Sequence, residues 1–280
     1  MFRYLTLLIV SLASPSLAQS VAPADWDLQR NAEQNSVVAY SAFDNGLTIA
    51  VRCDGTTFQA LIDGLPAVRS YVRPLRVRFP GMGADQNQTW NVAIQPTIAV
   101  SDFPAEFARR VRLGGNMDIV VPGGGEGGRN LRYVINLPAS NSAVDQTLQA
   151  CGRPLIDPRD VERTDIGERG LPVDIEWSRR PAATFPANAK YGRGLAVVSC
   201  LNSSEGVLQN CQIEAEYPQN AGFGAAALRS ATRARLRNAA GPATPMASRV
   251  VAFRVNFFVE GYENNYRPPA TAPTGSHLNN

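Results

Sequence analysis

Histidine and lysine are almost absent from this chain of 280 residues. The one histidine, His277, lies in a Pro/Thr/Asn-rich tail near the C-terminus, and Lys190 is the one lysine. This scarcity excludes a Ser-His-Asp or Cys-His triad, a histidine-ligated zinc and a proton-shuttling histidine in the folded core. A Ser-Lys dyad at Lys190 has no supporting motif. We therefore expect a protein that is not an enzyme, with no cofactor and no metal.

A large surplus of charge is also lacking. The sequence has 27 Lys+Arg against 24 Asp+Glu, whereas a chain that holds nucleic acid by neutralising phosphates carries a larger surplus. Hydrophobic residues make up 44% and charged residues 18%, which suffices for a sizeable core. These values predict no nucleic-acid partner, and one large domain or two ordinary ones.

No apolar run approaches the roughly 20 residues that span a bilayer. A shorter run, Tyr4 to Ala13, follows a basic start at Arg3 and precedes the small-x-small pattern Ser16-Leu17-Ala18. These are the three parts of a secretory signal. We predict a signal peptide over residues 1–18, cleaved after Ala18, and an exported protein with no stable membrane span. The alternative is an uncleaved N-terminal anchor.

Four cysteines, an even number, favour disulfides in an exported protein, and they allow three pairings. Cys200 and Cys211 flank a run that contains Glu205-Gly206. A turn centred there places the two cysteines opposite each other on one face. Cys53 ends an alternating strand and Cys151 ends an expected helix, so their bond would close one N-terminal domain. Without a CxxC motif or an available histidine, metal binding is disfavoured.

Residues 19–155 are predicted to form a β-rich domain with a sandwich or barrel-like fold and short helices. Short alternating runs suit half-buried strands, and Asp44-Asn45-Gly46 and Asp54-Gly55 are typical of hairpin turns. The expected helices are Phe103 to Leu113 and Ser142 to Ala150. The expected strands are Val37 to Phe43, Leu47 to Cys53, Thr57 to Ile62, Leu75 to Phe79, Thr89 to Ala93, Asn116 to Val121 and Arg129 to Leu137.

A polar connection and a second domain follow. We interpret residues 156–176 as a linker, because Asp157 to Arg169 is charged and lacks a sustained apolar stripe. Residues 177–262 are predicted to form an α+β domain, a small antiparallel sheet with helices on one face. Residues 263–280 are expected to be a disordered tail. The expected elements are strands Gly194 to Asn202 and Val207 to Glu216, a helix Phe223 to Arg237, and a last strand Val250 to Val259.

Three motifs could suggest chemistry, and each has a plainer interpretation. Gly123 to Gly128 contains GxGxxG, but a strand rather than a helix follows it, which favours a hairpin loop. Asp174 and Glu176 would share a strand face, yet nothing indicates a catalytic cleft around them. Three arginines at a spacing of four favour a solvated helix face over a groove for an acidic partner. They are Arg229, Arg233 and Arg237.

The order of motifs from Trp177 to Gly261 resembles the TonB C-terminal domain family. The segment has an aromatic-Pro-x-x-Ala start at Phe185 to Ala189 and a strand that ends in Cys200. A second strand, a helix with Ala226-Ala227-Leu228 and a final strand with Phe253 to Phe257 follow. The resemblance covers about a third of the chain, and no family is identified for the N-terminal region.

The resemblance implies a periplasmic module whose last strand pairs with an extended peptide of an outer-membrane transporter. Exposed backbone groups of an edge strand supply the affinity in such pairing. Because backbone bonds dominate, Arg254→Ala should have little effect and Arg254→Pro should break the pairing. The implied partner-binding strand consists of Val250, Val251, Ala252, Phe253, Arg254, Val255, Asn256 and Phe257.

The leading hypothesis is a periplasmic, non-catalytic binding or adaptor protein of the Gram-negative cell envelope, linked to outer-membrane transport. Its partner would be an envelope protein or peptide, such as a TonB-dependent outer-membrane transporter. The chain lacks the long Pro-rich spacer of an energy transducer. One alternative is nevertheless a TonB-type transducer component with an uncleaved anchor. Another is an envelope enzyme with its site in the N-terminal domain.

Overall fold

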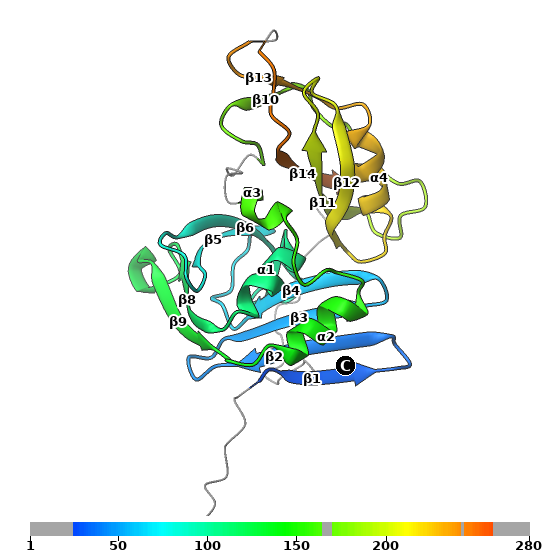
Figure 1. Cartoon of the computed structure of the whole chain (residues 1–280). Helices are drawn as coiled ribbons and strands as arrows, with labels where there is room; N and C mark the ends of the chain where they lie inside the picture. The colour runs from blue at the N-terminus through cyan, green and yellow to red at the C-terminus, as the bar shows by residue number, and fades with distance from the viewer. Residues whose placement is uncertain (1–24, 164–169, 242–243, 260–280) are drawn as a thin grey trace, which may run out of the picture.

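The computed structural model describes residues 25–163, 170–241 and 244–259 (Figure 1). The expected signal peptide and C-terminal tail lie outside these residues. Among the described helices, none combines the length and the apolar character needed to cross a membrane.

A nine-stranded antiparallel sheet dominates the N-terminal part of the chain (Figure 1). Its strand order is β1-β2-β3-β4-β7-β6-β5-β8-β9, and each neighbouring pair is antiparallel. The strands are β1 (Asp27–Asn31), β2 (Ser36–Ala42), β3 (Thr48–Asp54), β4 (Thr57–Asp63), β5 (Val72–Arg78), β6 (Gln86–Val92), β7 (Ala99–Ser101), β8 (Gly115–Val121) and β9 (Leu131–Leu137).

The hairpins expected at the start of this sheet are confirmed. Strands β2, β3 and β4 form a meander whose turns contain Gly46 and Gly55. These glycines have φ values of 83° and 62°, a conformation that residues with a Cβ atom rarely adopt. Gly123 to Gly128 likewise lies in the loop between β8 and β9, with a short 3-10 turn η1 (Glu126–Gly128). This confirms the hairpin-loop interpretation.

The sandwich or barrel-like fold expected for this region is wrong. The described strands form one open sheet, in which β1 and β9 each have a single neighbour. Helices cover it where a second sheet would lie in a sandwich. Helix α1 (Pro104–Val111) packs on β4 and β7, and α2 (Ser142–Ala150) packs on β2 and β3. Short alternating strands suit either arrangement, so the sequence pattern could not separate them.

An aromatic cluster fixes α1 against the sheet. The ring of Phe107 in α1 meets Trp90 of β6 and Phe79 edge-on, with centroids 5.2 and 5.7 Å apart. All three side chains are buried. Because α1 directly follows β7, this packing also fixes Asp102 and Phe103 in the connection between them, at the boundary of the nine-stranded sheet.

A three-stranded antiparallel sheet, in the order β12-β11-β14, forms the C-terminal part of the chain. Helix α4 (Phe223–Ala231) covers one face of it, where the Phe223 and Phe257 rings lie 4.9 Å apart. The sequence predicted a small antiparallel sheet with helices on one face. The sheet is present, and among the described residues from 177 onward α4 is the one helix. The remaining strands are β10 (Ile175–Arg179), β11 (Arg193–Asn202), β12 (Leu208–Tyr217), β13 (Arg235–Asn238) and β14 (Val250–Phe258), and β10 pairs with β13.

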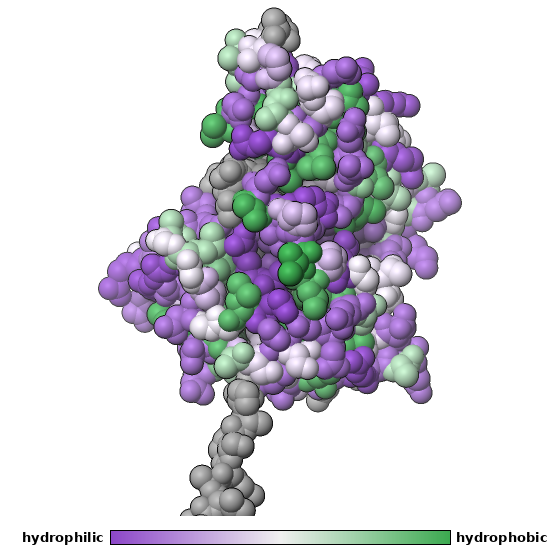
Figure 2. Space-filling view, in the orientation of Figure 1, coloured by the Kyte–Doolittle hydropathy of each residue, from purple (hydrophilic) through white to green (hydrophobic). Residues whose placement is uncertain are grey.

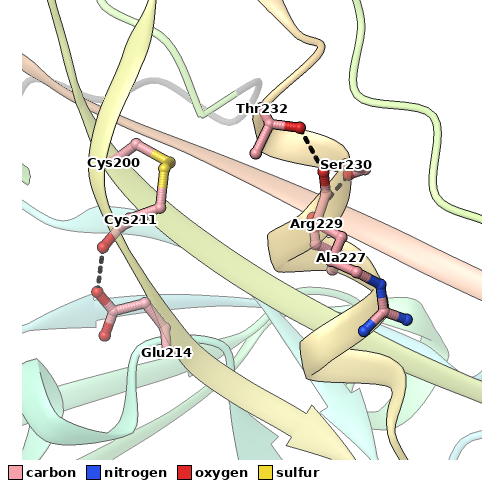
Figure 3. The surroundings of a disulfide bond; sticks show 8 residues. Cys200, Cys211, Glu214, Ala227, Arg229, Ser230 and Thr232 are labelled. Atoms are coloured by element: carbon pink, nitrogen blue, oxygen red, sulfur yellow. Dashed lines mark hydrogen bonds between the residues drawn. A yellow bond between two sulfur atoms is a disulfide. The ribbon is translucent and has the colours of Figure 1, made fainter.

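Helix α4 ends earlier than expected. The hydroxyls of Ser230 and Thr232 donate hydrogen bonds to the carbonyls of Ala227 and Arg229, at 2.6 and 2.9 Å (Figure 3). Hydroxyls bonded to nearby carbonyls compete with continuation of a helix. The chain then enters β13, so the three arginines at a spacing of four do not share a helix face. Arg237 instead pairs with Glu176 of β10 at 2.7 Å.

The described part of the expected linker is not a solvated connection. It contains α3 (Arg159–Arg163), and Asp157 just before it is buried. Arg109 of α1 donates from Nε to Asp160 at 2.5 Å. Burial alone would raise the pKa of Asp157. The hydrogen bonds from Arg159 and the charges of Arg159 and Arg109 outweigh burial and hold that pKa at about 2. Asp157 and Asp160, two of the charges that suggested solvation, are thus used in ion pairs with Arg109 of α1.

The two sheets meet at the face of the three-stranded sheet that lies opposite α4. Leu195, Val197 and Ala215 form a small apolar cluster there with Phe103 and Tyr217. Each face of this sheet is therefore covered at least in part, one by α4 and one by the connection between β7 and α1. A partner strand would have to approach the sheet along an edge.

Candidate functional site

One disulfide lies in each of the two parts of the chain. Cys53 bonds to Cys151, and Cys200 bonds to Cys211 across β11 and β12 (Figure 3). These are the two pairs predicted from the sequence. The register shifts by one residue beside Cys200, and Asn210 has a φ of 48° at this bulge. The shift keeps the cysteines adjacent.

The segment Val250 to Phe257, for which partner binding was expected, forms most of β14 on the edge of the three-stranded sheet. Val251, Phe253 and Phe257 belong to the core beneath α4. Arg254 and Asn256 occupy the opposite face. The alternation of faces predicted from the sequence is therefore present, because successive side chains of a strand point to opposite sides of the sheet.

The outer edge of β14 is covered at its beginning and, within the described part of the chain, has no backbone partner further along. The N–H of Val250 donates to Glu162 Oε2 at 2.8 Å, and the N–H of Ala252 donates to the carbonyl of Gly170 at 2.7 Å. Backbone groups alternate in direction along an antiparallel strand, so the next outward groups belong to Arg254, Asn256 and Phe258. Within the residues that the structure describes, no backbone group pairs with these three N–H groups.

The side chain of Arg254 joins the two sheets. Its Nη1 donates to Asp102 Oδ2 at 3.1 Å, and its Nη2 donates to Asn91 Oδ1. Asn91 in turn donates from Nδ2 to Asp102 Oδ1 at 2.7 Å. Burial raises the pKa of Asp102 to about 6, although the charge of Arg254 and the hydrogen bonds from Asn91 and Arg254 act in the opposite direction.

The expectation that Arg254→Ala should have little effect considered only the pairing of β14 with a partner, and this contact gives the side chain a structural role as well. The sequence placed Arg254 on the face away from α4 but gave no sign of what covers that face. Asn91 and Asp102 lie far from Arg254 in sequence, and no local pattern connects them to it. Asn256 is exposed and is therefore the better position at which to test the strand edge.

A cavity of about 960 Å³ lies beside Arg254, between the two sheets. One wall contains Ala252 to Val255 of β14 together with Trp177. The other contains Asp85 to Trp90, Asp102 and Phe107. Its volume is within the range of sites that bind ligands, and such sites often lie where two parts of a protein meet. No sequence pattern indicates this cavity, because its walls come from segments far apart in the chain.

The other candidate residues do not converge on this cavity. Asp174 lies 3.7 Å from Arg249 and Glu176 lies 2.7 Å from Arg237, and both carboxylates are partly exposed. Lys190 is exposed. In the described ranges, no group of three His, Cys, Asp or Glu residues could hold a metal ion.

The face seen in Figure 2 is largely hydrophilic, and its apolar side chains form small separate groups. Nothing on this face resembles the broad apolar patch that typically marks a large protein interface. The open backbone edge and the cavity are thus the features that distinguish the candidate site.

Comparison with solved structures finds a likeness to the TonB C-terminal domain of Pseudomonas aeruginosa, determined by solution NMR. The match has 17% sequence identity and a TM-score of 0.27, and it covers 31% of this chain and 89% of that chain. No family model and no curated protein matches the chain. A likeness of this size carries no argument about what the protein binds.

Proposed function

We propose that this protein is a non-catalytic periplasmic binding protein that recognises an extended segment of an envelope protein by strand addition to β14. The observation that carries the proposal is the outer edge at Arg254, Asn256 and Phe258, whose N–H groups pair with no backbone group among the described residues. Unpaired edge groups attract another strand, and main-chain bonds along such an edge provide affinity for an extended peptide.

Export to the periplasm rests on the secretory pattern at residues 1–18, and two disulfides suit an oxidising compartment. The non-catalytic role rests on the near absence of histidine and lysine from the sequence. The sequence resemblance makes an outer-membrane transporter the first partner to test. Recognition requires no cofactor, because the strand edge itself supplies the donors and acceptors.

The test places proline at Asn256. Asn256 lies opposite Leu195, and its N–H points away from β11, so proline removes an outward donor without breaking a bond of the sheet. Asn256→Ala is the matched control. A photoreactive amino acid at Phe258, which is 58% exposed, reports the neighbouring strand in intact cells.

We expect an envelope protein to be crosslinked in wild type and in Asn256→Ala and to be lost in Asn256→Pro. The circular dichroism and disulfide content of both variants should match wild type. Equal crosslinking in a folded Asn256→Pro protein would contradict strand addition at β14.

A further inference from the structure

The cavity between the two sheets follows the edges of two strands. Its walls include the consecutive residues Ala252 to Val255 of β14 and Asp85 to Trp90, which lead into and form most of β6. Successive side chains of a strand point to opposite faces. A cavity over one face would therefore contact every second residue, whereas one that contacts each residue in turn lies along the edge.

Strand β6 also has an open edge on this side. Its neighbour β7 pairs only with Trp90, Asn91 and Val92. Along residues 86–89, no other described strand lies on that side of β6. Val92 donates from its N–H to Tyr71, towards β5, so by alternation the backbone groups of Asn87 and Thr89 point away from β5.

The residue opposite Thr89 also indicates that the backbone groups of Thr89 point away from β5. It is Pro74 of β5, which has no N–H to donate. Proline is tolerated within a sheet where its nitrogen is not needed by the neighbouring strand. Thr89 therefore needs no partner in β5, and its backbone N–H and C=O are directed towards the cavity.

The side chains of Arg254 in β14 and Asn91 in β6 are hydrogen-bonded to each other beside the cavity and bridge the two strands. This bridge closes the cavity at the end where β7 begins to pair with β6.

The side chains around the cavity favour apolar and amide-bonding residues in the ligand. Phe103 and Trp177, both half-buried, contribute aromatic surface to the cavity, and Trp177 stacks edge-on against Phe253 with ring centroids 6.0 Å apart. Gln88 adds a side-chain amide, whose Oε1 accepts a hydrogen bond from Nε1 of Trp90 at 3.0 Å. Aromatic walls with a few polar groups are typical of sites that select by side-chain shape.

We propose that an extended peptide segment with an aromatic residue lies in this cavity and pairs with β14 on one side and with β6 on the other. The bound segment would join the three-stranded and nine-stranded sheets into one continuous sheet. The proposal rests on the proposed function, because β14 is one of the two edges. It adds a second edge, which belongs to the N-terminal part of the chain, and a requirement for an aromatic side chain.

The test uses synthetic nine-residue peptides in which threonine alternates with apolar residues and the central residue is phenylalanine. Two further peptides carry N-methyl groups on the odd-numbered or on the even-numbered amides, which point to opposite sides of a strand. The full mature chain is titrated with each peptide by fluorescence anisotropy. The protein variants are Asn256→Pro and Thr89→Pro, with Asn256→Ala and Thr89→Ala as matched controls.

Pairing with both edges predicts that either N-methylated peptide binds at least tenfold more weakly than the parent. It also predicts a loss of at least tenfold for each proline variant and little change for each alanine variant. Replacing the central phenylalanine by alanine should weaken binding as well.

If Thr89→Pro and one methylation pattern have no effect while Asn256→Pro abolishes binding, the second edge is wrong and the proposed function remains. If neither proline variant changes binding, or if no peptide binds, both proposals are overturned. Removal of residues 260–280 is a further comparison. In this comparison the proline variants are tested with and without the tail. If they leave binding of the parent peptide unchanged only in the protein that has the tail, the tail and not the peptide occupies the two edges. This result also overturns the proposal.

Discussion

Arg254 of β14 and Asp102, which follows β7, form a largely buried ion pair with Nη1 and Oδ2 3.1 Å apart, and this pair joins the three-stranded sheet to the nine-stranded sheet. The two side chains are 18% and 12% exposed. A strand near the C-terminus is thereby held beside a cavity whose opposite wall is built by residues more than a hundred positions earlier.

Arg254→Ala should destabilise the folded protein by about 3 kcal/mol, because it leaves Asp102 buried without its charged partner. Urea unfolding near neutral pH measures the loss. Arg237→Ala is the matched control, since its ion pair with Glu176 is half exposed and should contribute less than about 1 kcal/mol. Equal losses for the two variants would show that Arg254 does not hold the sheets together.

Asp102→Asn should alter how stability depends on pH. Burial raises the pKa of Asp102 to about 6, so between about pH 4 and 6 the folded state retains a proton that the unfolded state has released. This group therefore makes wild-type stability fall as the pH rises through that window. Asparagine does not titrate. The free energy of unfolding of the variant, measured relative to wild type, should therefore rise by about 2 to 3 kcal/mol as the pH increases from 4 to 7.

Asp157→Asn provides a control of opposite sign. The pKa of Asp157 is held at about 2, so its contribution to stability is present above about pH 4 and is lost as the pH falls towards 2. This variant should lose stability relative to wild type as the pH rises from about 2 to 4. A gain in that window, or a flat difference for Asp102→Asn, would contradict the assigned environments.

Removing the two disulfides should have unequal effects. The Cys53–Cys151 bond closes a loop with a sequence separation of 98, whereas the Cys200–Cys211 bond spans only 11. Chain entropy in the unfolded state predicts losses of about 4 to 5 and about 2 to 3 kcal/mol for the paired alanine variants. Thermal unfolding measures both, and a non-reducing peptide map checks the pairings. A crossed pairing would refute the fold described for both sheets.

Gly206→Ala should destabilise the tip of the β11–β12 hairpin. A Cβ atom at Gly206 would lie 2.1 Å from the carbonyl oxygen of Leu236, whose N–H donates to the Gly206 carbonyl. Gly46→Ala is the control, because Gly46 has a similar positive φ with nothing within 4 Å of the added atom. We expect the Gly206 variant to lose at least about 1 kcal/mol more. Similar melting temperatures for the two variants would indicate that the positive φ alone, and not the close contact with Leu236, determines the loss of stability.

The mature protein should begin at Gln19. The basic start, the short apolar run and the Ser16-Leu17-Ala18 pattern motivate this prediction. Intact-mass measurement of the soluble periplasmic fraction identifies the terminus. Recovery of the chain with Met1 from the membrane fraction would favour the alternative of an uncleaved anchor.

The sequence by itself determined the features that depend on neighbouring residues. Alternating apolar side chains located most strands, and Gly46 and Gly55 located two hairpin turns. The Ser142–Ala150 helix has the bounds that its apolar stripe predicted. The Cys200–Cys211 pairing followed from the register of one hairpin. Each of these is fixed by steric and solvent preferences that act over a few residues.

The sequence could not reveal strands whose pairing depends on distant neighbours. Strand β1 is polar and nearly all exposed, and β7 has only three residues, so neither shows a periodic pattern. Their positions come from the strands that they join. The end of α4 was also missed, because the chain continues with good helix-forming residues while the backbone bonds of β13 to β10 stabilise a strand there.

Only the tertiary structure decided that the nine strands form one open sheet, that Arg254 contacts Asp102 and Asn91, and that β6 and β14 border one cavity. Each of these relationships joins residues separated by long stretches of chain. The free energy that favours such contacts comes from burying surfaces of different elements against each other. A local pattern records that a surface is apolar or charged, and the packing of the whole chain decides what covers it.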